Sequence, residues 1–176
     1  MSPVDADTMR AFLNGLGQRQ TEPEILVLLG GSALLLLGSQ RTTLDIDYVG
    51  DDLVQTAFQD TIHEVATELE LYADPVPIAH FVPIPADSKT RQLFVDRYGK
   101  VDVFVIDPYV IALSKLDRGI DSDIADIVFL LERGFVELES LADRTTAAIE
   151  QAAAFDLDPI AMQRHLSIVR QRFRSV

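Results

Sequence analysis

The sequence predicts an α+β fold, in which a mixed β-sheet is followed by a group of helices. Before residue 107, short apolar runs end at Gly, Pro or Asp, and several alternate with acidic residues, as strands do when one face of a sheet is buried. From Pro108 onward the apolar residues recur at helical spacing. Strands followed by helices indicate an α+β arrangement. We therefore expect a sheet-containing core over residues 1–107 and a helical portion over residues 108–176.

In the first part of the core, strands and helices should alternate. One apolar run ends at Gly30-Gly31, which predicts a buried strand and a tight turn, and Ser32 stands where it could cap a helix. A second run alternates apolar and acidic residues and predicts a strand with one buried face. In chain order we expect a strand over 24–29, a helix from Ser32 to about Gly38, a strand over 44–49, and a helix from Asp51 or Asp52 to about Leu71.

The second part of the core begins with a proline-rich segment and ends in a hairpin. Two strand-like runs meet at Tyr98-Gly99-Lys100, which predicts the hairpin turn. Asp107-Pro108 then predicts the start of a helix, with Asp as the cap and Pro in the first position. The expected elements are an edge strand over 78–82, strands over 91–98 and 100–106, and helices over about 108–118, 122–132, 137–153 and 159–172.

Composition limits the classes of function. The net charge of −13 argues against broad, non-specific binding to a nucleic-acid backbone, which needs an extended basic surface. The chain has no cysteine, so disulfides and thiolate metal sites are excluded, and its three histidines form no zinc-ligand pair. Its longest apolar run is too interrupted to cross a bilayer, and the first residues lack the basic region of a signal peptide. We therefore expect a soluble cytoplasmic protein.

Gly30-Gly31-Ser32 is a candidate phosphate-binding turn. A strand that ends in two glycines before a helix offers free backbone N–H groups to an anion, and the missing side chains allow close approach. The alternative is a tight turn that only needs positive φ. The segment has no Gly-Lys-Ser/Thr, so it is not a P-loop, and its glycine spacing does not match the dinucleotide-binding fingerprint.

Asp45 and Asp47 are candidate ligands for Mg²⁺. Residues two apart on a strand point to the same side, with Leu44, Ile46 and Tyr48 on the other. Adjacent carboxylates repel unless a cation or a proton lies between them, and carboxylate oxygens suit Mg²⁺. The alternative is an edge strand with two ordinary solvent-facing acids.

Asp102 is the candidate third carboxylate. It lies on the face of its strand opposite to the valines, among large apolar neighbours, where an unpaired carboxylate is costly to bury. If its strand lies beside residues 44–49, Asp102 could bind the metal and act as base toward an acceptor hydroxyl. The alternative is a strand residue near the sheet edge, open to water. Asp96 is a weaker candidate for the same position.

Lys115 and Arg41 are candidate phosphate-binding cations. Lys115 lies on the helix that begins at Asp107-Pro108 and could stabilise the leaving pyrophosphate. Downstream, Asp123 and Asp126 share one helix face and could orient Lys115. For Lys115 the alternative is an exposed lysine in an ion pair that contributes little to stability, and for Arg41 it is a solvated loop arginine.

The pattern Gly30-Gly31-Ser32 … Arg41-Thr42-Thr43-Leu44-Asp45-Ile46-Asp47 resembles the signature of the polymerase-β-like nucleotidyltransferase superfamily. Within it, the chain is most similar to the AbiEii/MenT-type group, which includes many toxins of toxin–antitoxin pairs. The similarity extends to Lys115 … Arg118 … Asp123-Ile124-Ala125-Asp126 and covers residues 25–131.

The resemblance implies a catalytic core over residues 1–107, whose active site the helical portion completes. It implies that Asp45 and Asp47 bind Mg²⁺, that Ser32 contacts nucleotide phosphate, and that Lys115 and Asp126 belong to the active site. It also implies transfer of a nucleotide from an NTP to an acceptor, which in some relatives is a tRNA end. A cognate antitoxin is then a possible partner, and no membrane is expected.

Two other functions remain open at this point. The chain could be a catalytically inactive module of the same fold that binds a nucleotide or acts as an antitoxin. Alternatively, the acceptor could be a hydroxyl on a partner protein that receives AMP, which the net negative charge favours over an RNA acceptor.

Overall fold

The computed structural model describes residues 3–175, and it confirms the α+β class. The chain forms two compact units, one of Met1–Ile78 with Gln92–Ile106 and the other of Ala79–Arg91 with Asp107–Val176. The sheet lies in the first unit, and the second unit is helical. A boundary therefore lies beside residue 107, while residues 79–91, which the sequence placed in the core, belong to the helical unit. Within residues 3–175, no helix has the length and hydrophobicity that a bilayer crossing requires.

The first unit is built on a five-stranded mixed sheet in the order β3-β2-β1-β5-β4. The neighbours β1 and β5 are parallel, as are β2 and β3, whereas β2 is antiparallel to β1 and β4 is antiparallel to β5. The strands are β1 (Glu24–Leu28), β2 (Ile46–Val49), β3 (Ala73–Val76), β4 (Leu93–Tyr98) and β5 (Val101–Val105).

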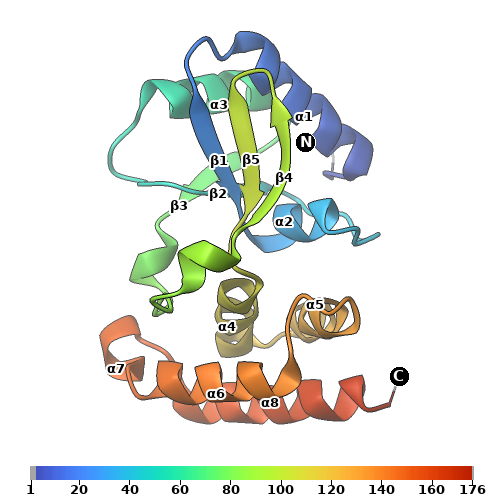
Figure 1. Ribbon diagram of the computed structural model, residues 1–176, viewed down its shortest axis with the longest axis vertical. Helices are drawn as coiled ribbons and strands as arrows, with labels where there is room; N and C mark the ends of the chain where they lie inside the picture. Colours follow the sequence, from blue (N-terminus) through green and yellow to red (C-terminus); the bar gives the residue numbers. More distant parts are fainter. Residues whose placement is uncertain (1–2, 176) are drawn as a thin grey trace. The chain divides into compact units, whose positions relative to one another are not determined.

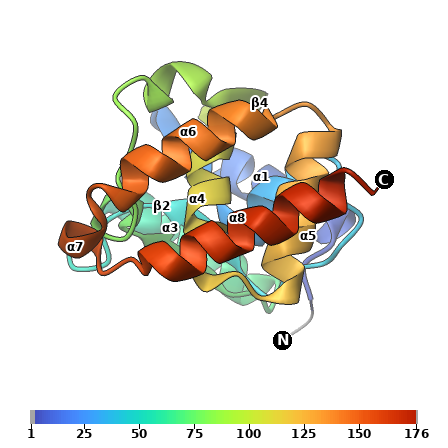
Figure 2. The same ribbon diagram turned by 90° about the horizontal axis from the view of Figure 1, so that it is seen from below.

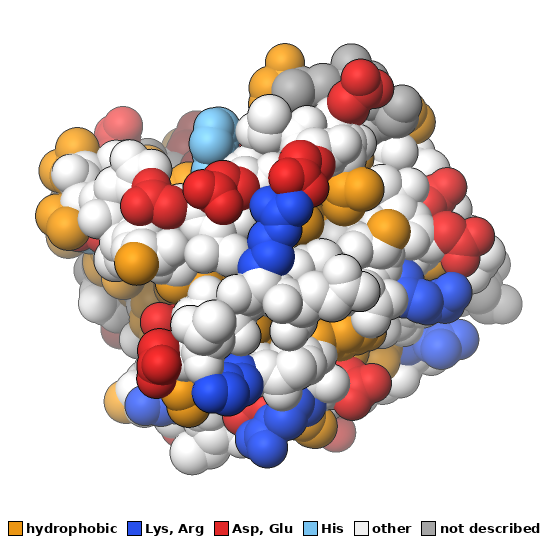
Figure 3. Space-filling view, turned by 90° about the horizontal axis from the view of Figure 1, so that it is seen from above, with side chains coloured by type: hydrophobic (Ala, Val, Ile, Leu, Met, Phe, Trp, Pro, Cys, Tyr) orange, Lys and Arg blue, Asp and Glu red, His pale blue; other side chains and the backbone are white. Residues whose placement is uncertain are grey.

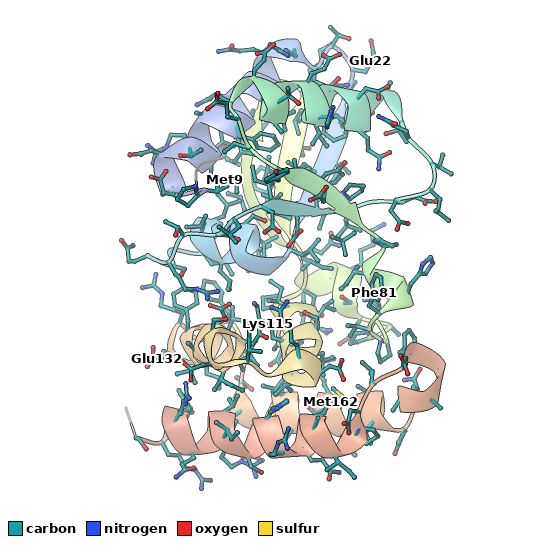
Figure 4. All side chains as sticks on the ribbon, turned by 180° about the vertical axis from the view of Figure 1, so that it is seen from behind. Met9, Glu22, Phe81, Lys115, Glu132 and Met162 are labelled. Atoms are coloured by element: carbon teal, nitrogen blue, oxygen red, sulfur yellow. The ribbon has the colours of Figure 1, made fainter. Side chains whose placement is uncertain are left out.

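Helices cover one face of this sheet. Helices α1 (Ala6–Arg19) and α3 (Ala57–Glu68) lie on the same side of it, as Figures 1 and 4 show from opposite directions. The side chains of Val101, Val103 and Val105 are fully buried, so the valine alternation of β5 marks the covered face. Burial of each large apolar side chain stabilises the fold by about 1.5–3 kcal/mol relative to exposure.

Several boundaries differ from the sequence predictions. Helix α1 was not predicted, although Asp5 caps it by accepting a 2.8 Å hydrogen bond from the backbone N–H of Thr8. Helix α3 begins at Ala57 instead of after Asp52, because Thr56 forms a capping box with Gln59. The edge strand expected over 78–82 is wrong: β3 lies earlier, and Ile78–His80 forms the 3₁₀ turn η1.

The second unit is a group of helices that begins at Asp107. The predicted cap is confirmed, since the Asp107 carboxylate accepts a 2.9 Å hydrogen bond from the backbone N–H of Tyr109, with Pro108 in the first turn. Arg91 also donates to this buried carboxylate at 2.6 Å, which compensates its burial. The helical elements are η2 (Ser88–Arg91), α4 (Pro108–Arg118), α5 (Asp121–Glu132), α6 (Leu138–Ile149), α7 (Ala152–Phe155) and α8 (Pro159–Phe173).

Helix α8 holds this unit together by packing on α4, α5 and α6 (Figure 2). His165 of α8 donates from Nδ1 to the carbonyl oxygen of Leu116, 2.6 Å away, near the end of α4. Gly119 ends α4 in the left-handed conformation with φ +58°. A side chain at Gly119 would overlap the His165 ring, so this position requires glycine for both its conformation and its space.

We predict that Gly119→Ala destabilises the protein far more than Gly134→Ala does. Both glycines have positive φ, but nothing lies within 4 Å of a Cβ at Gly134. The Gly134→Ala change should therefore cost about 1 kcal/mol from backbone conformation alone. The Gly119→Ala change should cost about 3 kcal/mol, because overpacking against His165 adds to the conformational term. Urea unfolding measures the loss of stability in each variant, and equal losses would contradict the packing of His165 against Gly119.

Candidate functional site

The turn after β1 is packed against the segment that carries the two aspartates. Gly30 opens helix α2 (Gly30–Leu36) with φ +62°, and a Cβ there would lie 2.6 Å from Oδ2 of Asp47. A Cβ at Gly31 would lie 2.5 Å from the hydroxyl oxygen of Thr43. A Cβ at Gly30 would displace the Asp47 carboxylate, and a Cβ at Gly31 would lie only 2.8 Å from Cβ of Thr43, so both positions favour glycine. The turn and the Asp47 carboxylate therefore lie side by side.

Asp45 and Asp47 differ in their local structure. Strand β2 begins at Ile46, so Asp47 lies within it and Asp45 immediately precedes it. Ile46 and Tyr48 face the covered side, while both aspartates are partly exposed. Leu44 is 76% exposed and lies outside the strand, so its expected position on the buried face is wrong.

Thr43 is a residue of this site that the sequence did not predict. Its hydroxyl donates to Oδ1 of Asp45 at 3.3 Å, and its backbone pairs with Val4 in an isolated antiparallel bridge. The missing side chain at Gly31 leaves the space that Thr43 occupies. The only signal in the sequence was the threonine pair before the Asp-x-Asp motif, and its partner depends on the fold.

Ser32 does not cap helix α2, because the cap position is Leu29. The Ser32 hydroxyl instead donates to the carbonyl oxygen of Leu29 at 2.8 Å and to that of Asp47 at 3.2 Å. Ser32 is fully buried. Its side chain therefore fastens the turn to β2. Partial exposure of Gly30 and Gly31 leaves their backbone as the accessible part of the turn.

Asp102 does not join Asp45 and Asp47. In the parallel pairing of β1 and β5, Asp102 lies opposite Ile25, whereas the backbone carbonyl of Asp47 bonds to the N–H of Leu29. Four residues along β1 correspond to about 13 Å, so the expected three-carboxylate cluster is wrong.

The Asp102 carboxylate has a different partner. It forms an ion pair with Arg97 on β4, with Nη2 of Arg97 2.8 Å from Oδ2 of Asp102. This hydrogen bond lowers the pKa of Asp102. Asp96, the weaker candidate, is exposed on β4 and lies opposite Val103.

Arg41 lies in the exposed loop between α2 and β2, where its backbone N–H donates to the Ser39 hydroxyl at 3.3 Å. Arg41 is therefore close in sequence to Thr43 and Asp45, shortly before β2 begins at Ile46.

In the helical unit, Lys115 lies between two carboxylates of the next helix. Its Nζ atom is 2.7 Å from Oδ2 of Asp126 and 3.2 Å from Oδ1 of Asp123, and Figure 4 shows it between α4 and α5. The Lys115 residue is only 6% exposed. The alternative of an ordinary exposed ion-pair lysine is therefore wrong.

Arg118 completes this cluster by donating to both oxygens of Asp123, at 2.7 and 2.6 Å. Burial alone would raise the pKa of Asp123, but the hydrogen bond from Arg118 and the positive charge of Lys115 outweigh it, so the pKa is lowered. Asp123 is therefore held as a carboxylate. The Lys115 ammonium group is therefore held in one position by two carboxylates.

The carboxylates of Asp45 and Asp47 fit a Mg²⁺ ion that shares its ligands with substrate. They are hard oxygen donors, partly exposed, beside a turn with accessible backbone. Among residues 3–175 no group of three or more His, Cys, Asp or Glu side chains is arranged to hold a metal. Mg²⁺ commonly takes one or two carboxylates and fills its other positions with water and phosphate oxygens, so a pair suffices.

The chain is similar to one described protein family. A family model described as "Nucleotidyltransferase of unknown function (DUF6036)" matches residues 7–169. No curated protein and no solved structure matches the chain. The match spans the strands and turn of the first unit and most of the helical unit.

We predict that Lys115→Met destabilises the protein by about 3 kcal/mol, because removing one member of a buried ion cluster leaves charge uncompensated. The matched control is Lys89→Met, which removes the same charge from an exposed position and should change stability by less than about 0.5 kcal/mol. Denaturant unfolding of both variants provides the test. A Lys115→Met variant as stable as the control would show that the cluster adds nothing.

Proposed function

The chain belongs to the family of nucleotidyltransferases of unknown function (DUF6036), and from this premise we propose that it is a magnesium-dependent enzyme that transfers a nucleotide from an NTP to an acceptor hydroxyl. The observation that carries the proposal is the close approach of the Asp47 carboxylate to the Gly30 turn. A carboxylate, which can bind Mg²⁺, and partly exposed backbone, which can receive phosphate, lie together there, and transfer from a triphosphate requires both groups.

In the proposed site, Asp45 and Asp47 would hold Mg²⁺, which would neutralise charge on the triphosphate oxygens. The backbone of Gly30 and Gly31 would receive the phosphates, since these residues are partly exposed and carry no side chain. Ser32 acts as a positioning residue, because its buried hydroxyl holds the turn against the carbonyl of Asp47. Thr43 orients Asp45 through its hydroxyl.

The reaction is an in-line displacement at the α-phosphorus of the NTP. The acceptor oxygen forms a bond to that phosphorus, the bond to the bridging oxygen breaks, and pyrophosphate leaves with its electron pair. The acceptor proton passes to solvent or to a carboxylate of the Asp45–Asp47 pair. Asp102 has no part in this step because the sheet register places it elsewhere.

Lys115, Asp126 and Arg41 enter the proposal through the resemblance to the AbiEii/MenT-type group. The fixed charge of Lys115 suits stabilisation of a leaving pyrophosphate, and Asp126 would hold its ammonium in place. Arg41, in its exposed loop, would meet phosphate. A toxin role with a cognate antitoxin follows from the same resemblance and is part of the proposal.

We predict that replacing Asp45 and Asp47 by Asn lowers transfer by about a thousandfold, which corresponds to roughly 4 kcal/mol of lost transition-state stabilisation. The fold should remain intact, because Asn has nearly the same size as Asp and both residues are partly exposed. The measurement is transfer of label from an α-labelled NTP in a cell lysate, together with pyrophosphate release.

The matched control is Asp51→Asn with Asp52→Asn, which makes the same charge change at two exposed neighbours. It should retain transfer. Incorporation by the Asp45/Asp47 variant at the wild-type rate would overturn the assignment. If wild-type protein is stabilised by NTP with Mg²⁺ yet releases no pyrophosphate, the chain is a nucleotide-binding module instead of an enzyme.

A further inference from the structure

The open face of the sheet carries an aromatic pair. Phe94 on β4 lies opposite Phe104 on β5, and their rings meet edge to face with centroids 5.3 Å apart. Phe104 in turn lies opposite Val27 on β1, so the three side chains form a row across neighbouring strands. Ile25 lies two residues before Val27 on the same face. We call these four residues the aromatic platform.

The aromatic platform is exposed. Phe94 is 57% and Ile25 62% exposed, while Phe104 and Val27 are partly exposed. The buried valines of β5 alternate with Phe104, so the platform lies on the face opposite to helices α1 and α3 (Figure 1). Exposed aromatic rings on an open face offer flat surfaces on which bases can stack.

The aromatic platform lies on the same face as the Asp47 carboxylate and close to it along the sheet. Asp47 lies between the buried residues Ile46 and Tyr48, so its side chain is on the open face of the sheet. Tyr48 pairs with Leu28, which is also buried, so its strand neighbour Val27 is on the open face as well. Val27 and its partner Phe104 are two residues from Leu29, where the Asp47 carbonyl bonds. Val27 is one strand across from Asp47 and two residues along, which corresponds to about 8 Å, while Phe104 and Phe94 are two and three strands across, at about 12 and 16 Å.

We propose that the aromatic platform stacks the bases of a single-stranded nucleic-acid acceptor, whose 3′ hydroxyl then lies at Asp47. The inference rests on the proposed function and names the acceptor class for it. At about 3.4 Å per stacked nucleotide, the distance from Asp47 to the aromatic pair corresponds to about four to five nucleotides. Exposed aromatic side chains on an open sheet stack two or three bases in the same manner in RNA-binding domains.

The size of the aromatic platform argues against a protein as its occupant. It spans three strands and about two residue steps, an area of roughly 70–100 Å². A stable protein interface covers about 800 Å² on each partner. Beyond the platform the open face becomes charged, with the Arg97–Asp102 ion pair beside Ile25. A short row of bases needs no larger apolar surface.

The net negative charge, which disfavours an RNA bound through its phosphates, opposes a short strand held by stacking less strongly. On the face seen in Figure 3, acidic and basic side chains are interspersed instead of gathered in one basic tract, and the net charge is −13. Long nucleic acids bound by their phosphates need many basic contacts, whereas base–aromatic stacking itself contributes about 1–3 kcal/mol per base. Binding should therefore depend weakly on salt, with a slope no steeper than about −1.4, which corresponds to two phosphates on a single strand.

The test is fluorescence anisotropy of a labelled single-stranded RNA hexamer with a free 3′ hydroxyl, on the Asp45→Asn/Asp47→Asn protein without NTP. Phe94→Ala should weaken binding about five- to hundredfold, and Phe94→Tyr should restore it. Phe81→Ala is the matched control, because Phe81 is 55% exposed and lies outside the aromatic platform; it should leave the affinity unchanged. Circular dichroism verifies the fold of each variant.

Three results would overturn the proposal: equal affinity of Phe94→Ala and wild type, full binding by Phe94→Leu, or no preference for the single strand over a blunt duplex. Full binding by Phe94→Leu would indicate plain apolar contact, as with a polypeptide. Transfer by the active protein is measured separately on the same hexamer. Platform-dependent binding without any transfer contradicts the proposed function alone, while transfer only to protein contradicts the aromatic platform alone.

Discussion

The first unit depends on how closely the Asp47 carboxylate approaches the turn after β1. A side chain at Gly30 would displace that carboxylate, and the left-handed φ of Gly30 also favours glycine. Ser32 strengthens the same contact by donating to the carbonyls that flank the turn, one from Leu29 and one from Asp47. Residues far apart in sequence are thereby fixed at one end of β1, so the position of β2 and the position of the candidate site are set together.

Elements with a local cause could be predicted from the sequence. The valine alternation of β5, the turn at Gly99 and the Asp107-Pro108 helix start each follow from backbone preferences within a few residues, and all three are present. Helix α1 was missed because its cap at Asp5 stands among other acidic residues. The start of α3 was misplaced because two aspartates precede the threonine that caps it, and Leu53, which lies within the predicted helix, is 87% exposed.

The candidate site shows that the sequence pattern determines neither the position of a residue along the sheet nor its burial. Alternation predicts the face of a strand residue, and Asp102 does lie on the face opposite to the valines. The pairing of strands decides the position along the sheet, and it places Asp102 opposite Ile25, with Arg97 as its partner. The sequence predicted that Asp123 and Asp126 could orient Lys115, and both ion pairs are present, whereas the burial of Lys115 comes from packing that the pattern does not specify.

The most direct measurement of the central claim is Mn²⁺ binding, followed by electron paramagnetic resonance, with and without a non-hydrolysable NTP. Mn²⁺ replaces Mg²⁺ at oxygen sites and reports its own binding. If Asp45 and Asp47 hold a cation against a triphosphate beside the Gly30 turn, the protein binds one ion, the nucleotide tightens that binding, and Asp47→Asn abolishes the effect. Mn²⁺ binding that does not change when the nucleotide is added, or that is equally strong in Asp47→Asn, would contradict the claim.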